Sequence, residues 1–179
     1  MPIKEFHWKN KDGNQVYAKK WTIKTPKANL CLIHGVGEHC NRYNHFADFY
    51  NQKGLSVFSL DLPGHGKTEG KLGHSRGIEA FMEEAETVIN VAKKENPNRP
   101  TFLYGHSMGG NIVLNYLLRK NPQIQGLIAS GPWITLPNPP PFLLVWIGRL
   151  LNKITPSLVL ETELDGTKVS RDQAVVDDY

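Results

Sequence analysis

The sequence has few cysteines, no long apolar run and no apolar segment at its start. Two cysteines among 179 residues, Cys31 and Cys40, are too few for a disulfide scaffold and are typical of a reducing compartment. No stretch approaches the roughly 18 consecutive apolar residues of a membrane-spanning helix. The opening residues, MPIKEFHWKNKDG, also lack the apolar segment of a secretory signal. We therefore expect a cytoplasmic protein.

Charge of one sign is never concentrated in this sequence. The 21 basic and 17 acidic side chains give a net charge of +4, and no basic run is longer than the pairs Lys19-Lys20 and Lys93-Lys94. A nucleic-acid-binding surface would need basic residues gathered on one face, so we expect no nucleic-acid partner. The small positive excess is weak evidence for attraction to anionic membrane surfaces.

The order of the expected strands and helices indicates an α/β fold. Residues 4–10 and 15–24 are typical of two strands joined by a hairpin turn at Asp12-Gly13. From Leu30 onward, short apolar strands that end in glycine alternate with amphipathic helices, which predicts a mostly parallel sheet flanked by helices on both faces. We expect the strands at 29–35 and 101–107 to be buried. Cys31 should then be a core residue and Cys40, in a loop, partly exposed.

The alternation of strands and helices stops after Trp133. We expect residues 1–132 to form the core and residues 133–179 to form a segment that crosses the carboxyl end of the sheet. This segment contains a proline-rich lead-in, an apolar helix after Pro141 and a polar, irregular final part. The helix is apolar on two sides, which suggests contact with lipid. The alternative is packing against another part of the protein or another subunit.

Ser107 lies in the motif G-x-S-x-G, formed by residues 105–109. An apolar strand pattern precedes the motif and a helical pattern follows it, as a nucleophile turn requires. The flanking glycines allow the turn to be sharp, and unpaired N–H groups at the start of the next helix favour negative charge. The sequence therefore predicts Ser107 as a catalytic nucleophile. The alternative is a glycine-rich turn that contains an incidental serine.

The segment HGVGEH, residues 34–39, follows another expected strand. Acyl transfer needs a second N–H group for the oxyanion, and the backbone of Val36 can supply it beside the backbone of Met108. One alternative is that the glycines only form a turn. Another is a zinc site, but the spacing differs from H-E-x-x-H on a helix, so we expect no metal.

Three segments, HGVGEHCNRY, LDLPGHGKTEG and YGHSMGG, together resemble the monoacylglycerol lipase and lysophospholipase branch of the α/β-hydrolases. The combination H-G-x-G-E-H-x-x-R-Y is the specific part, because G-x-S-x-G alone marks a far larger superfamily. The resemblance implies that Ser107 is the nucleophile and that Glu38, Arg42 and His106 line the pocket for a glycerol-like leaving group. It also implies that residues 133–179 form an incomplete cap, whose apolar helix borders an acyl channel. Alternatively, Glu38 and Arg42 form a loop salt bridge and His106 packs beside the turn.

The segment DLPGHG contains two further polar residues, Asp61 and His65. Asp61 precedes Ser107, whereas the acid of an α/β-hydrolase triad follows the nucleophile. We expect Asp61 and His65 to brace their loop by hydrogen bonds. The resembling family has a serine where this chain has Thr68, a departure that leaves the mechanism unchanged.

No histidine follows His106, although the general base of this fold should follow the nucleophile. Four aspartates do follow Ser107, but they lie in the expected cap, outside any buried strand: Asp165, Asp172, Asp177 and Asp178. We therefore expect the triad aspartate and histidine outside this chain. It would then be the N-terminal part of a longer hydrolase, whose remaining roughly 100 residues are cleaved, disordered, truncated or carried by a second polypeptide. A rearranged site would instead use His39 or His74 as base.

The sequence thus predicts a serine hydrolase that cleaves monoacylglycerol or lysophospholipid esters through an acyl-enzyme, without a metal or organic cofactor. We expect the chain alone to be nearly inactive, because removing the base of a serine triad costs several orders of magnitude in rate. An alternative from another class is a non-catalytic module that binds acyl ligands or partners. Acyl transfer, peptidase and thioesterase chemistry also use the same turn.

Overall fold

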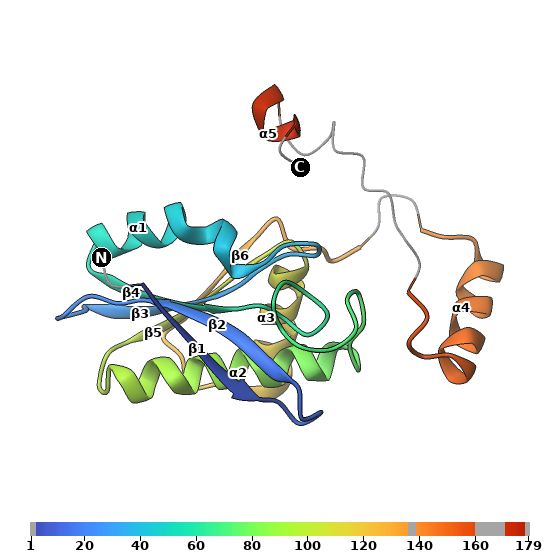
Figure 1. The fold of residues 1–179 in the computed structure, drawn as a ribbon, viewed down its shortest axis with the longest axis horizontal. Helices are drawn as coiled ribbons and strands as arrows, with labels where there is room; N and C mark the ends of the chain where they lie inside the picture. The colour runs from blue at the N-terminus through green and yellow to red at the C-terminus, as the bar shows by residue number, and fades with distance from the viewer. Residues whose placement is uncertain (1–2, 136–138, 160–170, 178–179) are drawn as a thin grey trace.

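The computed structural model describes residues 3–135, 139–159 and 171–177 of the chain. Its centre is a six-stranded sheet with the order β1-β2-β4-β3-β5-β6 (Figure 1). The strands are β1 (Ile3–Lys9), β2 (Gln15–Trp21), β3 (Ala28–Ile33), β4 (Leu55–Leu60), β5 (Thr101–His106) and β6 (Gly126–Ser130). β1 and β2 form an antiparallel hairpin that joins β4, and β4, β3, β5 and β6 run parallel. The expected hairpin and mostly parallel sheet are confirmed.

Helices cover both faces of the sheet, as the alternating pattern predicts. α1 (Asn44–Gln52) lies on one face, and α2 (Ile78–Glu95) and α3 (Met108–Lys120) lie on the other (Figure 1). A 3-10 turn, η1 (Cys40–Tyr43), leads into α1. α2 has Glu79 in its first turn and Lys93 and Lys94 in its last, so its charges complement the helix dipole.

The core has two parts, one on each face of the sheet. All six residues of β3 are buried, as expected for a central parallel strand. β5 differs from the prediction, because buried residues alternate with the partly exposed Phe102, Tyr104 and His106. The reason is that α1 packs against β4 and β2 and leaves the neighbouring part of that face only partly covered.

Both cysteines are buried. The expectation for Cys31 is confirmed, and the expectation of partial exposure for Cys40 is wrong. The Cys40 backbone N–H donates a hydrogen bond to Oδ1 of the buried Asp61 at 2.7 Å. This bond draws the start of η1 into the core, where Cys40 packs with Trp21 and Ala47.

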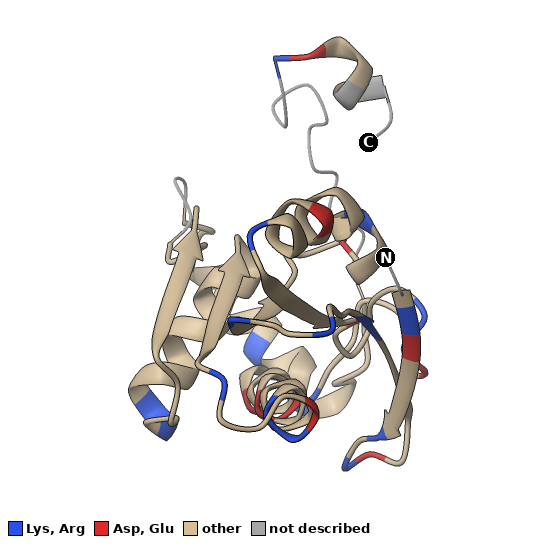
Figure 2. Cartoon of the chain, turned by 90° about the vertical axis from the view of Figure 1, so that its left-hand side faces the viewer, with Lys and Arg blue, Asp and Glu red and all other residues tan. Residues whose placement is uncertain are grey.

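Basic and acidic residues are scattered over the surface in Figure 2 rather than gathered on one face, as the sequence suggests. None of the helices in the described ranges combines the length and apolar composition needed to cross a bilayer.

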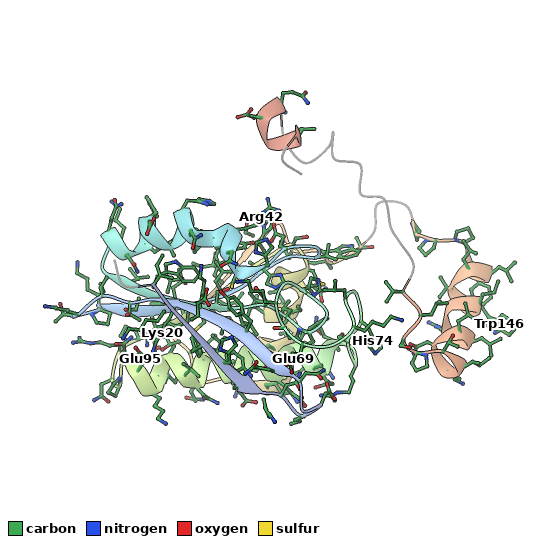
Figure 3. All side chains as sticks on the ribbon, viewed as in Figure 1. Lys20, Arg42, Glu69, His74, Glu95 and Trp146 are labelled. Carbon is green, nitrogen blue, oxygen red and sulfur yellow. The ribbon has the colours of Figure 1, made fainter. Side chains whose placement is uncertain are left out.

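Beyond β6, the expected helix is present as α4 (Phe142–Ile154). It stands apart from the sheet, beyond its carboxyl end, instead of lying across it (Figure 1). None of its residues is buried, and Trp146 is far from Arg42 in Figure 3. The segment after α4 touches the core, because Nζ of Lys71 donates to the Ser157 carbonyl and the Val159 side chain lies against Gly73.

The final part of the expected cap is described only over residues 171–177. It contains a short helix, α5 (Gln173–Asp177), where the sequence suggested irregular structure. Asp172 explains the difference, because its Oδ1 accepts a hydrogen bond from the Ala174 N–H at 3.0 Å and so caps the helix. The polar segment 160–170 lies outside the described residues.

Candidate active site

Ser107 occupies the turn between β5 and α3 with φ 52° and ψ −116°. L-residues rarely adopt a positive φ, and holding one there costs about 1–3 kcal/mol. Backbone hydrogen bonds fix the turn: the Ser107 N–H donates to the Ser130 carbonyl at 3.0 Å, and the Ser107 carbonyl accepts from Trp133 N–H at 3.0 Å and Asn111 N–H at 3.1 Å. The strand-turn-helix context predicted for Ser107 is confirmed.

Three glycines allow β5, α3 and β3 to approach one another around this turn. A Cβ on Gly105 would lie 2.3 Å from the carbonyl oxygen of Gly109, and one on Gly109 would lie 2.2 Å from that of Ile33. A Cβ on Gly110 would lie 2.9 Å from Pro132. Since the atoms nearest to Gly105 and Gly109 are backbone, no side chain fits at those two positions.

The segment that follows β3 lies directly against the Ser107 turn. A Cβ on Gly35 would be 3.2 Å from the Cβ of Ser107. The fold therefore brings together the two segments that the sequence singled out, although 72 positions (107 minus 35) separate these residues in the chain. No described residue accepts a hydrogen bond from the backbone N–H of Val36 or of Met108. Both groups are available to a ligand.

His34 is fully buried behind this segment. Its Nδ1 lies 2.7 Å from the Gly35 carbonyl oxygen, and its Nε2 accepts a hydrogen bond from the Leu62 N–H at 3.0 Å. Burial lowers the pKa of His34 to about 4, so the ring is neutral with its proton on Nδ1. Both ring nitrogens are occupied by backbone groups, so His34 links the ends of β3 and β4 and is not free to bind a metal ion.

Glu38 is held by two hydrogen-bond donors and one ion pair. Its Oε2 accepts hydrogen bonds from the Gly35 N–H at 2.9 Å and the Tyr43 hydroxyl at 2.7 Å. Arg42, which is half-exposed, pairs with Oε1 at 3.3 Å. Partial burial acts to raise the pKa of Glu38, but these partners and the nearby His106 outweigh it and hold the pKa below its usual value.

His106 lies at the end of β5, immediately before the nucleophile turn. Its Nδ1 is 3.4 Å from the Ser130 Oγ, on the neighbouring strand β6. Glu38 thus lies beside the Ser107 turn, Arg42 pairs with Glu38, and His106 directly precedes Ser107. Glu38 and Arg42 also form the loop salt bridge that the sequence left open as an alternative. Tyr43 and Ser130 were not singled out as site residues, although Tyr43 ends the H-G-x-G-E-H-x-x-R-Y pattern.

Asp61 braces two loops, as predicted. Its Oδ1 accepts from the Cys40 N–H at 2.7 Å and its Oδ2 from the Lys67 N–H at 2.8 Å. Thr68 continues the network, because its hydroxyl donates to the Asp61 carbonyl at 2.5 Å and accepts from the Tyr17 N–H at 3.0 Å. His65 also has a bracing role, since its Nδ1 lies 3.1 Å from the Pro63 carbonyl oxygen.

No imidazole among the described residues is hydrogen-bonded to the Ser107 hydroxyl. His74 lies on the loop that faces α4, apart from Arg42, which lies near the start of α1 (Figure 3). Of the four aspartates that follow Ser107, Asp172 is exposed and caps α5, while Asp165, Asp178 and the side chain of Asp177 lie outside the described residues.

Comparisons with known proteins give a consistent result. A family model described as serine aminopeptidase, S33, matches residues 24–179. The monoacylglycerol lipase of Mycolicibacterium smegmatis is 36% identical over 168 residues, which is 93% of this chain and 60% of the relative. The monoglyceride lipase of Rattus norvegicus is 33% identical over 175 residues, which is 97% of this chain and 57% of the relative.

Two solved structures share the fold and are more than 25% identical in sequence to this chain. A monoacylglycerol lipase from Paleococcus ferrophilus matches with a TM-score of 0.79 and 34% identity, over 92% of this chain and 61% of that protein. A soluble variant of the Saccharomyces cerevisiae monoglyceride lipase, in complex with a substrate analogue, has a TM-score of 0.79 and 27% identity, over 99% of this chain and 61% of that protein. The chain therefore spans less than two thirds of the relatives it matches.

Proposed function

We propose, from the premise that this chain belongs to the serine aminopeptidase S33 family of α/β-hydrolases, that it carries the nucleophile of a serine esterase. Its similarity to monoacylglycerol lipases suggests monoacylglycerol or lysophospholipid esters as substrates. The conformation of Ser107 carries the proposal. A serine at φ 52°, immediately before a helix and between glycines that accept no side chain, presents its hydroxyl where an activated nucleophile is needed.

The reaction proceeds through an acyl-enzyme. Oγ of Ser107 forms a bond to the ester carbonyl carbon, and its proton passes through a general base to the departing alcohol. The unpaired N–H groups of Val36 and Met108 stabilise the negative charge on the former carbonyl oxygen, aided by the N-terminus of α3. Water then hydrolyses the acyl-enzyme and releases the fatty acid. These steps use no metal ion or organic cofactor.

The leaving group binds beside Glu38, Arg42 and His106. Oε2 of Glu38 is occupied by Gly35 and Tyr43, whereas Oε1 is paired with Arg42 alone among the residues that the structure describes. A carboxylate oxygen, a guanidinium and an imidazole together offer an acceptor and several donors, which suits the vicinal hydroxyls of glycerol. The half-exposed Arg42 is also suited to a phosphate, as in a lysophospholipid head group.

The aspartate and histidine of the triad come from residues outside this chain. They lie either in a continuation of the same polypeptide or in a second polypeptide that completes the site. Asp61 is not the missing acid, because its two carboxylate oxygens already accept backbone N–H groups of Cys40 and Lys67.

The cap, residues 133–179, contributes the route for the acyl chain. α4 exposes Phe142, Leu144 and Trp146 by 80%, 59% and 54% of their surfaces. An exposed apolar helix on the carboxyl side of the sheet is suited to peripheral contact with a lipid surface from which the substrate is drawn. The protein would then act in the cytoplasm, at the membrane surface.

Substrate hydrolysis tests the proposal. We expect the protein, as its gene encodes it, to release fatty acid from monoacylglycerol, and Ser107→Ala to abolish the release. Aminoacyl amides test peptidase action, and acyl thioesters test thioesterase action. If none of these substrates turns over while an acyl glycerol still binds, the alternative of a non-catalytic acyl-binding module is correct. That alternative rests on the absence of a base hydrogen-bonded to Ser107 in the described part of the chain.

A further inference from the structure

The oxyanion loop, residues 34–38, accepts a hydrogen bond from Tyr43, which lies outside the loop. Oε2 of Glu38 accepts the Gly35 N–H at 2.9 Å and the Tyr43 O–H at 2.7 Å. Tyr43 is 9% exposed and lies at the end of η1. Among the described residues, its hydroxyl has no other hydrogen-bond partner.

The Gly35 N–H comes one residue before the Val36 N–H, which is the proposed oxyanion donor. A peptide unit is planar, so the Val36 N–H and the Gly35 carbonyl point in opposite directions within one rigid unit. His34 Nδ1 contacts that carbonyl at 2.7 Å. The same carbonyl accepts a longer hydrogen bond from the Glu38 N–H at 3.4 Å. Gly35 is thereby fixed on its carbonyl side by His34 and the Glu38 backbone, and on its N–H side by the Glu38 carboxylate. Because glycine has no side chain, these hydrogen bonds are what resists rotation of its backbone.

We propose that Tyr43 is a positioning residue for the oxyanion loop, which acts by holding Glu38 on the Gly35 N–H and so aims the N–H of Val36. The inference rests on the proposed function, and it gives the two carboxylate oxygens of Glu38 separate tasks. Oε2 braces the loop, and Oε1, with Arg42, faces the leaving group.

The hydrogen bond is strong enough for this role. A hydroxyl that donates to a charged carboxylate forms a shorter and stronger bond than one between neutral groups. The pKa of Tyr43 is raised by its burial and by this bond, and the pKa of Glu38 is lowered, so the pair stays in the phenol–carboxylate form at neutral pH. Losing the bond frees the carboxylate to rotate toward Arg42.

Tyr43→Phe tests the proposal with two substrates in the protein as its gene encodes it. Monoacylglycerol uses both the oxyanion hole and the leaving-group pocket, whereas p-nitrophenyl butyrate has no glycerol group. We expect kcat to fall about 10-fold for both substrates, with KM changed by less than about twofold. This loss is smaller than the 10²–10³-fold cost of deleting an oxyanion donor, because the Val36 N–H is misaimed but present.

Tyr17→Phe is the matched control. It removes another tyrosine–glutamate hydrogen bond, from the Tyr17 hydroxyl to Oε1 of Glu5 at 2.5 Å, but in the N-terminal hairpin. It should leave kcat unchanged. If Tyr43→Phe lowers only thermal stability, or raises only the KM for monoacylglycerol, the positioning role is wrong and Tyr43 serves folding or head-group binding.

A second pair of variants covers the case in which Tyr43→Phe does not fold. Glu38→Gln keeps an oxygen acceptor for the Gly35 N–H, and Glu38→Ala does not. With p-nitrophenyl butyrate, Glu38→Gln should retain at least about fivefold more kcat than Glu38→Ala, because only the latter releases a donor beside the oxyanion hole. Equal losses overturn the inference. A wild-type protein without Ser107-dependent activity overturns the proposed function itself, and this inference with it.

Discussion

The strained backbone of Ser107 predicts a difference in stability between two variants, which can be measured without a substrate. Ser107 has φ 52° and ψ −116°, a conformation that glycine adopts freely and other residues adopt at a cost. Ser107→Ala and Ser107→Gly both remove the hydroxyl, which has no hydrogen-bond partner among the described residues. The two variants therefore differ mainly in whether the turn remains strained.

The expected difference follows from two opposing terms. A residue held in such a conformation costs about 1–3 kcal/mol. Glycine gains extra freedom in the unfolded chain, which lowers stability by about 0.4–1 kcal/mol. Ser107→Gly should thus have a free energy of unfolding about 1 kcal/mol higher than Ser107→Ala. In a chain of 179 residues, this corresponds to a Tm about 2–4 °C higher.

Thermal and denaturant unfolding, followed by circular dichroism, measure this difference. The control is the pair Asn90→Gly and Asn90→Ala on the exposed face of α2. There the backbone is helical, so alanine should be the more stable by about 1 kcal/mol. The reasoning is refuted if Ser107→Ala is as stable as Ser107→Gly, because the turn would then store no strain.

Three further predictions follow from buried contacts. Gly109→Ala should lower the free energy of unfolding by about 1–3 kcal/mol in denaturant titrations. The reason is that the new Cβ would lie 2.2 Å from the backbone oxygen of Ile33. An unchanged unfolding midpoint would contradict the close approach of α3 to β3. Glu84, which is buried and accepts the Trp8 Nε1–H at 2.7 Å, has a pKa raised by burial. The ionised form of Glu84 therefore destabilises the fold, so Glu84→Gln should raise Tm at pH 7. The gain in Tm should shrink toward pH 4, where the carboxyl group is protonated. A gain that is independent of pH would show that the buried charge is not its cause. His34, whose pKa burial lowers to about 4, should remain an Nδ1-protonated neutral ring in NMR titrations down to about that pH. Because a histidine in the unfolded chain takes up its proton near pH 6.5, stability should fall as the pH drops from there toward 4, and a ring that titrates above pH 6 would disprove the assignment.

Most of the fold could be predicted from the sequence, because short apolar strands and amphipathic helices leave periodic patterns. The hairpin at Asp12-Gly13 and the parallel strands lie where these patterns indicate. The strand order could not be predicted, because it depends on pairing between residues distant in the chain. The burial of Cys40 was missed for a similar reason, since it depends on a hydrogen bond to Asp61, 21 positions later.

For the candidate site, the motif around Ser107 predicted the turn, and the glycine contacts explain why. Tyr43 was harder to find, because its spacing from Phe46 and Tyr50 is that of residues on one face of a helix, which gives no sign of a role in the site. The structure places Tyr43 at the end of η1, just before α1, with its hydroxyl donating to Glu38. The position predicted for α4, across the sheet, was wrong, because an apolar helix shows that a surface needs covering but not which one.

The central claim is that Ser107 is a nucleophile, and covalent labelling tests it most directly. The protein, as its gene encodes it, is treated with a fluorophosphonate, and the labelled peptide is identified by mass spectrometry beside Ser107→Ala. The account predicts one adduct, on Ser107, that is absent from the variant. It also predicts much weaker labelling of the 179-residue chain alone, unless a second polypeptide carrying an aspartate and a histidine copurifies. A wild-type protein with no adduct, or with an adduct that persists in Ser107→Ala, would contradict the claim.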